Sequence, residues 1–398
     1  MWGRDFLLLV QGQAVSCLGD TLYSVVAGLW VYGLTGSTVA MSAVYAAGNL
    51  ARLLTFPLAG VITDRYSRRN LVVFCDAICG ISMLAVAAVS EFAAEAAVWA
   101  LVGYSGISSI CYGVFHSSIS TLMLSLVRKE DFVRANSVYS AVEYGVNVIG
   151  QGIAGTLYLF LGAPVIFLFN GLTFLISAGT EILIHKDAKP ERDKTKPFFS
   201  EALEGACYIF RSSGVRLVLL TAFLINFTFG VLRVALVPWM LEFGEECYGL
   251  LGSFRSAGVI LGAVLLAVKN IPEAKRYQVY YWSQLLFPAC IATAAGLHDF
   301  LPIAVLFCVA YANQYVFNSL QRSAVILASP DEIRGKVICA VQALTMGFSA
   351  FGNLTGGYLC RWKSPKELIF FMMVLLFLCV VCLAGKTSVR KLFAVPQR

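Results

Sequence analysis

Long apolar runs recur along almost the whole of this chain, and they constrain its fold more than any other feature. A helix needs roughly 20 mostly apolar residues to cross the hydrocarbon core of a bilayer. Breaking the runs at polar or charged turns predicts an all-α integral membrane protein with twelve transmembrane helices. These helices are expected at residues 6–33, 38–62, 70–90, 95–127, 133–160, 164–185, 216–241, 248–268, 278–297, 301–324, 333–360 and 366–385.

The composition also indicates a chain that lies in a membrane. Hydrophobic residues make up 59% of the 398 residues and charged residues only 13%, whereas a soluble domain carries about 25% charged residues. The formal net charge of +7 does not indicate nucleic-acid binding, because the Lys and Arg residues lie in short loops and not along one helix face. We expect these residues to set the topology and to contact anionic lipid headgroups in the bilayer.

The distribution of basic residues predicts the orientation, because positively charged loops stay on the cytoplasmic side during insertion. With both termini placed inside, most of the 30 Lys and Arg residues fall on the inner side. We therefore expect a multi-pass protein of the inner or plasma membrane with both termini in the cytoplasm. The exceptions are Arg361, Lys363 and Lys366 on the outer side, and Arg52, Arg233 and Arg255 within predicted spans.

The longest polar segment divides the chain into two halves with six predicted spans each. We expect an N-terminal bundle at residues 1–186, a cytoplasmic linker at 187–215 and a C-terminal bundle with a cytoplasmic tail at 216–398. Residues 198–210 of the linker place apolar side chains on one face, which predicts a short amphipathic helix at the membrane surface.

The turn between the second and third predicted spans carries a charged motif. Its sequence is Gly-Val-Ile-Thr-Asp-Arg-Tyr-Ser-Arg-Arg-Asn, at residues 60–70. This motif is similar to the signature loop of the major facilitator superfamily, which usually has a glycine where Ser67 stands. The resemblance implies two six-helix repeats that rock around a central site; the alternative is a generic loop that only sets topology. The residues expected to latch the cytoplasmic side closed are Gly60, Asp64, Arg65, Arg68 and Arg69.

The first span resembles one branch of that superfamily more closely. It opens with Gly12-Gln13-x-x-Ser16-x-x-Gly19-Asp20 and is followed by Leu-Thr-Gly-Ser at residues 34–37. These motifs resemble the macrolide-efflux branch, which contains drug and siderophore exporters. The resemblance implies export of an amphipathic small molecule, such as a drug-like compound or a siderophore, by alternating access. The runner-up hypotheses are a lipid or nutrient carrier of the same fold and a non-transporting membrane sensor.

Four ionisable residues within predicted spans are candidates for coupling transport to an ion, and protons are one candidate ion. Asp20 and Arg52 lie near the middle of the first two spans, Glu143 in the fifth and His116 in the fourth. A lone charge at such a depth costs about 2.5 to 3.5 kcal/mol on insertion scales, so each needs a partner or a water-filled cavity. Asp20 and Arg52 can equally form a structural ion pair, and Glu143 and His116 can equally be packing residues. Ser109 occupies the position where proton antiporters of the family carry an arginine.

The tenth span is polar for its depth, with amide side chains recurring along it. The family resemblance places spans one, four, seven and ten around the substrate cavity. The alternative is that about half of these polar residues only bond neighbouring helices. Besides Asp20 and His116, the residues expected to line the cavity are Gln13, Asn226, Arg233, Asn313, Gln314, Asn318 and Gln321.

No motif in the sequence predicts catalysis or a bound cofactor. Gly150-Gln-Gly-Ile-Ala-Gly155 matches the letters of a dinucleotide fingerprint, but no strand precedes it and it lies within a hydrophobic span. Such glycines allow helices to approach closely. The three histidines are dispersed, without a zinc or nucleophile–base pattern. We expect a monomeric non-enzyme with no metal and no cofactor.

Overall fold

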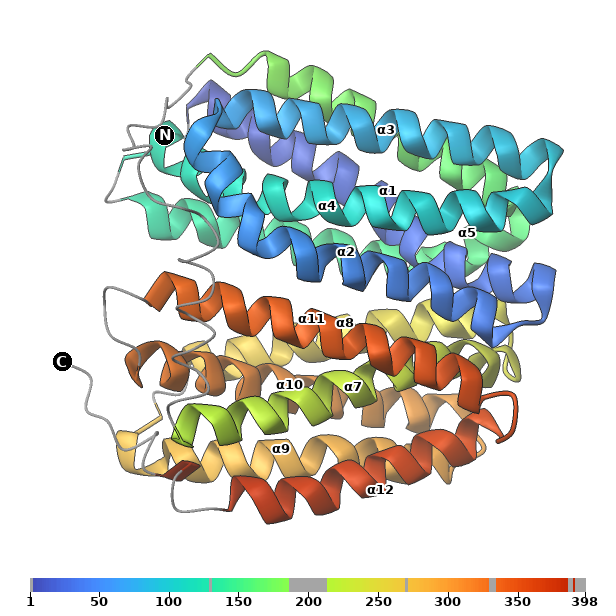
Figure 1. Cartoon of the computed structure of the whole chain (residues 1–398), viewed down its shortest axis with the longest axis vertical. Coiled ribbons are helices and arrows are strands. Elements are labelled where there is room, and N and C mark those ends of the chain that lie inside the picture. The colour runs from blue at the N-terminus through green and yellow to red at the C-terminus, as the bar shows by residue number, and fades with distance from the viewer. Residues whose placement is uncertain are drawn as a thin grey trace. The chain divides into compact units, whose positions relative to one another are not determined.

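The structure is a computed structural model that describes residues 3–128, 131–185, 213–268, 271–328, 334–385 and 389–390. All regular elements in these ranges are helices, which confirms the predicted all-α class (Figure 1). The helices are α1 (Arg4–Thr35), α2 (Thr38–Arg65), α3 (Arg68–Phe92), α4 (Ala94–Leu126), α5 (Phe132–Ile182), α7 (Ser213–Leu241), α8 (Glu245–Val268), α9 (Glu273–Ala295), α10 (Phe300–Ala328), α11 (Arg334–Leu359) and α12 (Pro365–Ala384).

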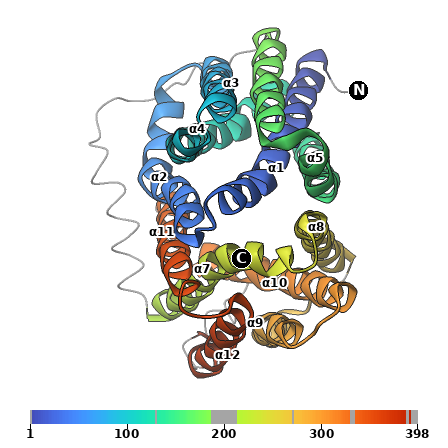
Figure 2. The ribbon, with the colours of Figure 1, turned by 90° about the vertical axis from the view of Figure 1, so that its right-hand side faces the viewer.

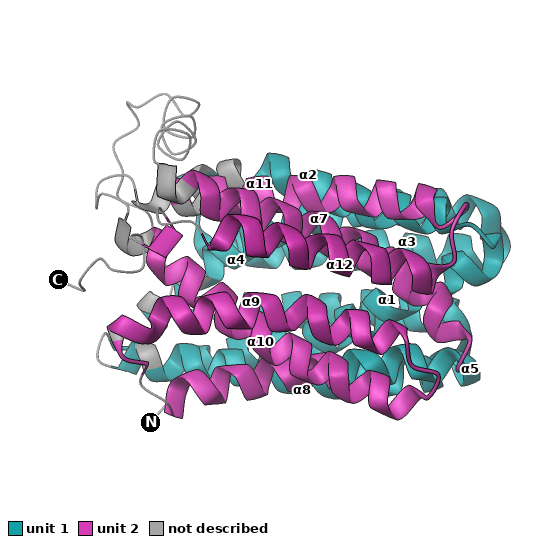
Figure 3. Ribbon diagram, turned by 90° about the horizontal axis from the view of Figure 1, so that it is seen from below, with its two compact units in different colours: residues 1–196, 244–253 teal, residues 197–243, 254–398 magenta. Residues whose placement is uncertain are grey.

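The chain divides into two compact units (Figure 3). The first comprises residues 1–196 and 244–253, and the second comprises residues 197–243 and 254–398. The predicted linker at 187–215, with its amphipathic helix, lies outside the described residues up to residue 212, and α7 begins at Ser213. Within the first unit, α1 packs along α5, α3 packs on α4 and α5, and α2 packs on α4, as the end-on view in Figure 2 illustrates.

Helix α5 is interrupted by a residue with non-helical backbone. The interruption lies where the sequence predicts a turn between the fifth and sixth spans. Gly162 has φ 73° and ψ 168°, and Pro164 follows it. Only glycine adopts this backbone region without strain, and proline cannot continue the hydrogen bonding of a preceding turn. The 51 residues of α5 therefore form two helical parts, which correspond to the fifth and sixth predicted spans.

Contacts with α1 show that the second part of α5 runs antiparallel to α1. A Cβ built on Gly12 would lie 2.9 Å from Ser177 Oγ, and a Cβ built on Gly19 would lie 2.6 Å from Asn170 Oδ1. The position along α1 thus increases as the position along α5 decreases.

The first part of α5 runs in the opposite sense, parallel to α1. Cys17 Sγ lies 3.8 Å from the Glu143 carbonyl oxygen, and Thr21 Oγ1 donates to Asn147 Oδ1 at 3.1 Å. Since the two parts run in opposite directions beside the same helix, the chain reverses at Gly162.

By length and composition, eight of the described helices can cross a membrane, with α5 counted once. Helices α2, α9 and α11 fall outside that set, so the described residues do not fully resolve the predicted count of twelve. The composition explains two of these cases. Helix α2 has Asn49 and Arg52 in its middle, and α9 carries Gln278 and Gln284 among tyrosines and a tryptophan.

Glycines allow close helix crossings in the second unit. A side chain at Gly258 or Gly262 of α8 would collide with the backbone carbonyls of Cys308 or Ala312 of α10. Gly352 of α11 faces the backbone of α7 in the same way. These contacts bring the backbones of the paired helices together without intervening side chains.

Candidate functional site

A cavity of about 380 Å³ lies within the first unit, lined by side chains of α1 to α5. It gathers the four candidate coupling residues, Asp20, Arg52, His116 and Glu143, together with Gln13. Protein atoms surround Asp20, but its side chain is accessible to solvent through the cavity. In a membrane, a charged group needs a partner or water. This need explains why these side chains face the same cavity.

Arg52 lies where it can interact both with the carboxylate and with an aromatic ring. Its charge acts on Asp20, and its guanidinium carbon lies 4.6 Å from the centre of the Tyr112 ring. The Tyr112 ring in turn lies 5.8 Å from the His116 ring, measured between centroids. A guanidinium over an aromatic face is a favourable cation–π arrangement. The contacts thus connect α2, α4 and α1 across the cavity.

Several lining residues were absent from the sequence-based list. Asp76 of α3 lines the cavity and is only 3% exposed. Its signal in the sequence was a lone carboxylate within an apolar run, the same signal that identified Asp20. Ser109, by contrast, lies away from the cavity and against α2, since a Cβ built on Gly48 would lie 2.9 Å from its Oγ.

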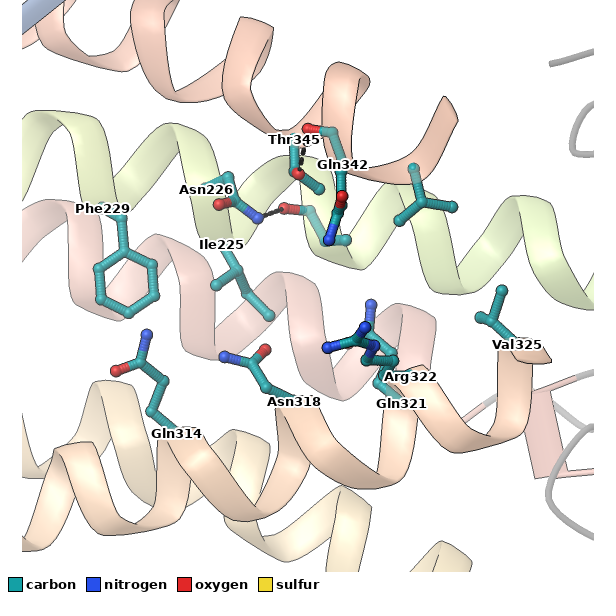
Figure 4. A pocket seen from close by; sticks show the side chains of 12 residues that line it. Ile225, Asn226, Phe229, Gln314, Asn318, Gln321, Arg322, Val325, Gln342 and Thr345 are labelled. Carbon is teal, nitrogen blue, oxygen red and sulfur yellow. Dashed lines mark hydrogen bonds between the residues drawn. The ribbon is translucent and has the colours of Figure 1, made fainter. Parts of the chain in front are cut away.

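A second cavity, of about 340 Å³, lies within the second unit (Figure 4). Side chains from α7, α10 and α11 converge on it. Four predicted cavity residues line it: Asn226, Gln314, Asn318 and Gln321. Arg322, Gln342 and Thr345 line it as well, but sequence reasoning had placed Arg322 in a cytoplasmic loop and had not singled out the other two.

The polar groups of this cavity are only partly satisfied within the chain. Asn226 Nδ2 donates to the Ala222 carbonyl oxygen at 2.9 Å, and Thr345 Oγ1 donates to the Gln342 carbonyl oxygen at 2.9 Å. Gln321 is 9% exposed, and its Oε1 has no hydrogen-bond partner among the described residues. The cavity therefore offers amide groups to a ligand beside apolar surface.

Two predicted cavity residues lie elsewhere. Arg233 of α7 is exposed and does not belong to the lining of this cavity. Asn313 of α10 donates from Nδ2 to the Val309 carbonyl oxygen of its own helix at 2.8 Å. This bond lies within α10, so it matches neither a place in the cavity lining nor the alternative of a bond to a neighbouring helix.

The charged motif at residues 60–70 is mostly helical rather than a loop. Helix α2 continues to Arg65 and α3 begins at Arg68, so only Tyr66 and Ser67 are non-helical. Ser67 Oγ accepts a hydrogen bond from the Asn70 N–H at 3.2 Å, which caps α3. The cap explains how serine serves at a position where glycine is usual.

The basic residues of the motif reach neighbouring elements. Arg69 donates from Nη2 to the Ile182 carbonyl oxygen at 2.7 Å, which ties the start of α3 to the end of α5. Arg65 is exposed and Arg68 is partly buried. The side chain of Asp64 and the surroundings of Gly60 lie outside the described parts of the structure.

Among the described residues, no group of three or more His, Cys, Asp or Glu side chains is placed to hold a metal ion.

Comparison with known proteins identifies the family. A sequence profile described as Major Facilitator Superfamily matches residues 9–342. The chain belongs to the major facilitator superfamily. The family resemblance seen in the sequence is thereby confirmed, and this member of a transporter family is a multi-pass membrane protein whose substrate class is small molecules.

Individual relatives are distant. YfiS, an uncharacterized MFS-type transporter of Bacillus subtilis strain 168, is 22% identical over 404 residues, covering 96% of this chain and 93% of YfiS. Macrolide efflux protein A of Streptococcus pyogenes is 21% identical over 230 residues, covering 57% of this chain and 56% of that protein. The crystal structure of the nucleoside transporter NupG has a TM-score of 0.75 at 12% identity, covering 97% of this chain and 100% of that chain. This last similarity confirms the fold.

Proposed function

We propose that this major facilitator is a secondary active transporter that exports an amphipathic small molecule by alternating access, coupled to an ion. The observation that carries the proposal is the cavity of the first unit, in which Asp20, Arg52, His116 and Glu143 face one space within a membrane bundle. Charged groups are expensive at this depth and mark ion or substrate pathways.

The amphipathic character of the substrate is inferred from the lining of the two cavities. The first cavity combines charged groups with Phe115 and Phe174, and the second combines amides with Ile225 and Phe229. A ligand with both apolar and hydrogen-bonding surface fits such walls. The similarity to a relative named macrolide efflux protein A supports export as the direction of transport.

The proposal extends to the arrangement in the cell. The N-terminal bundle at 1–186 and the C-terminal bundle at 216–398 rock against each other as a monomer in the cell membrane, with both termini in the cytoplasm. The motif around Asp64 and Arg68 latches the cytoplasmic side closed, and protons are the coupling ion that Asp20 and Glu143 can carry.

Flux measurements on reconstituted vesicles test this function. The purified protein is reconstituted, a pH gradient is imposed, and uptake and efflux are followed for a panel of macrolides, hydrophobic cations, siderophores and nucleosides. We expect gradient-dependent movement of at least one amphipathic compound out of the side that corresponds to the cytoplasm. Binding without flux for every compound that binds would contradict the proposal and would favour a sensor.

A further inference from the structure

Two carboxyl groups in the first unit are buried deeply and take no part in the proposed function. Asp76 of α3 is 3% exposed, and Glu181 in the second part of α5 is 1% exposed. The two groups lie close enough to interact through their charges. Two carboxylates in a dry bundle repel each other, and each is costly to bury without a compensating charge.

The oxygen atoms around this pair have no hydrogen bond of good geometry among the described residues, and the single hydroxyl proton of Ser177 can be donated to only one of the two carboxyl groups. They are Asp76 Oδ2, both carboxylate oxygens of Glu181 and Oγ of Ser177. Ser177 is fully buried, lies one turn before Glu181 and interacts with both carboxyl groups. Unsatisfied buried polar atoms are rare in proteins and call for an explanation, such as an ion. Here several of them are gathered at one place.

A glycine on the facing helix allows the α1 backbone to approach these oxygen atoms closely. A Cβ built on Gly12 of α1 would lie 2.9 Å from Ser177 Oγ and 3.7 Å from Glu181 Oε1. Asn170 lies two turns before Ser177 on the same helix face, where its amide interacts with Asp20 and Tyr104. The buried oxygens thus lie along one stripe of α5, between α1 and α3.

The charged and titratable side chains that act on the pair provide no positive charge. They are Asp20 of α1, Cys75 and Cys79 of α3, Cys111 of α4 and Tyr139 of α5. Arg69 donates a hydrogen bond to the Ile182 carbonyl oxygen instead. The pair is therefore neutralised either by protons or by a bound cation.

We propose that Asp76, Glu181 and Ser177 bind one small hard metal cation, of the size of sodium or calcium. Carboxylate, hydroxyl and amide oxygens are the ligands that such cations prefer. The ion reaches the site through the cavity, because Asp76 is part of the cavity wall. The proposal concerns cation binding alone, and it does not depend on the proposed export function.

Thermal unfolding of the purified full-length protein in detergent tests this site. The reference buffer contains choline chloride, and NaCl, KCl, CaCl2 or MgCl2 is titrated in. Binding to the folded state alone raises the melting temperature, by about 5 °C at a concentration one hundred times Kd. We expect this rise for sodium or calcium, and we expect acidification to weaken it because protons compete for the carboxylates.

Isosteric variants assign the site. Glu181→Gln and Asp76→Asn should each weaken the apparent affinity for the cation at least about tenfold, and Ser177→Ala should weaken it less. Glu143→Gln is the matched control, since it makes the same chemical change on the same helix at the wall of the same cavity, and it should keep the full rise. Loss of the rise in Glu143→Gln but not in Glu181→Gln would overturn the assignment.

Direct binding to the wild-type protein keeps the test independent of variant folding. Equilibrium dialysis with radioactive sodium or calcium should give one bound ion per chain. If neither cation binds and acidification alone raises the melting temperature, the pair is neutralised by protons and the proposal is wrong. This outcome leaves the flux measurements, and therefore the proposed export, untouched.

Discussion

Asp20 and Arg52 of the first cavity have two possible roles, a structural ion pair or the coupling of transport to an ion. Both line the cavity, and the charge of Arg52 acts on the Asp20 carboxylate. A structural pair would hold α1 and α2 together, whereas a coupling role requires Asp20 to bind and release a proton during the cycle. The two roles make opposite predictions for a neutral side chain of the same shape.

Asp20→Asn should abolish transport driven by a pH gradient while exchange without a gradient stays measurable, because the amide keeps the shape and loses the titration. If Asp20 only neutralises Arg52, the single variant instead leaves an unpaired cation in the bundle, and its melting temperature falls. In that case Asp20→Asn combined with Arg52→Gln restores both stability and transport. Glu143→Gln provides the comparison. If both single carboxylate variants keep gradient-driven transport, neither Asp20 nor Glu143 is the obligatory proton carrier.

Sequence reasoning identified charged residues of this cavity where a charge stood out in an apolar run. It found Asp20, Arg52, His116 and Glu143 for that reason, and they do share one cavity. It did not single out Glu181, because this residue lies near the end of a predicted span where a charge is ordinary. Only packing against α1 and α3 buries Glu181, and a single sequence carries no signal for that contact.

At the scale of elements, the ends of the predicted spans agree with the ends of the helices to within a few residues. The exception is α5, which covers two predicted spans with no polar turn between them. The motif at residues 60–70 was expected to be a loop because it is charged, but charge does not end a helix when the backbone can continue. Helix α2 continues to Arg65, and the cap at Ser67 starts α3. The reversal in α5 was placed correctly because Gly162 and Pro164 restrict the backbone itself.

Gly162→Ala should lower the stability of the protein by about 1–3 kcal/mol, because an alanine is strained at φ 73°. Gly179→Ala is the control, since Gly179 lies within the second part of α5 and a Cβ there meets nothing within 4 Å. That control should be neutral or more stable by about 0.5–1 kcal/mol. Thermal unfolding in detergent measures both, and an equal effect of the two substitutions would contradict the assigned turn.

The motif between α2 and α3 is proposed to act as a latch, and its substitution tests this role. Asp64→Asn or Arg68→Ala should leave the protein inserted in the membrane but reduce transport about tenfold, because contacts made in only one access state bias the equilibrium between states. Arg65→Ala, in which an exposed arginine of the same motif is removed, shows how much of the effect is general loss of charge. Normal flux with unchanged conformer populations in Asp64→Asn and Arg68→Ala would reduce the motif to a signal for topology.

At the scale of the whole molecule, the central claim is that the polar cavity of the first unit opens to each side of the membrane in turn. Ser140 lines this cavity, and a cysteine there in a variant without the 12 native cysteines reports on access. The measurement is the labelling rate by a membrane-impermeant thiol reagent, added to either side of oriented vesicles, with and without a pH gradient. The account predicts labelling from both sides and a ratio of rates that shifts with the gradient. Labelling from one side only under every condition would contradict it.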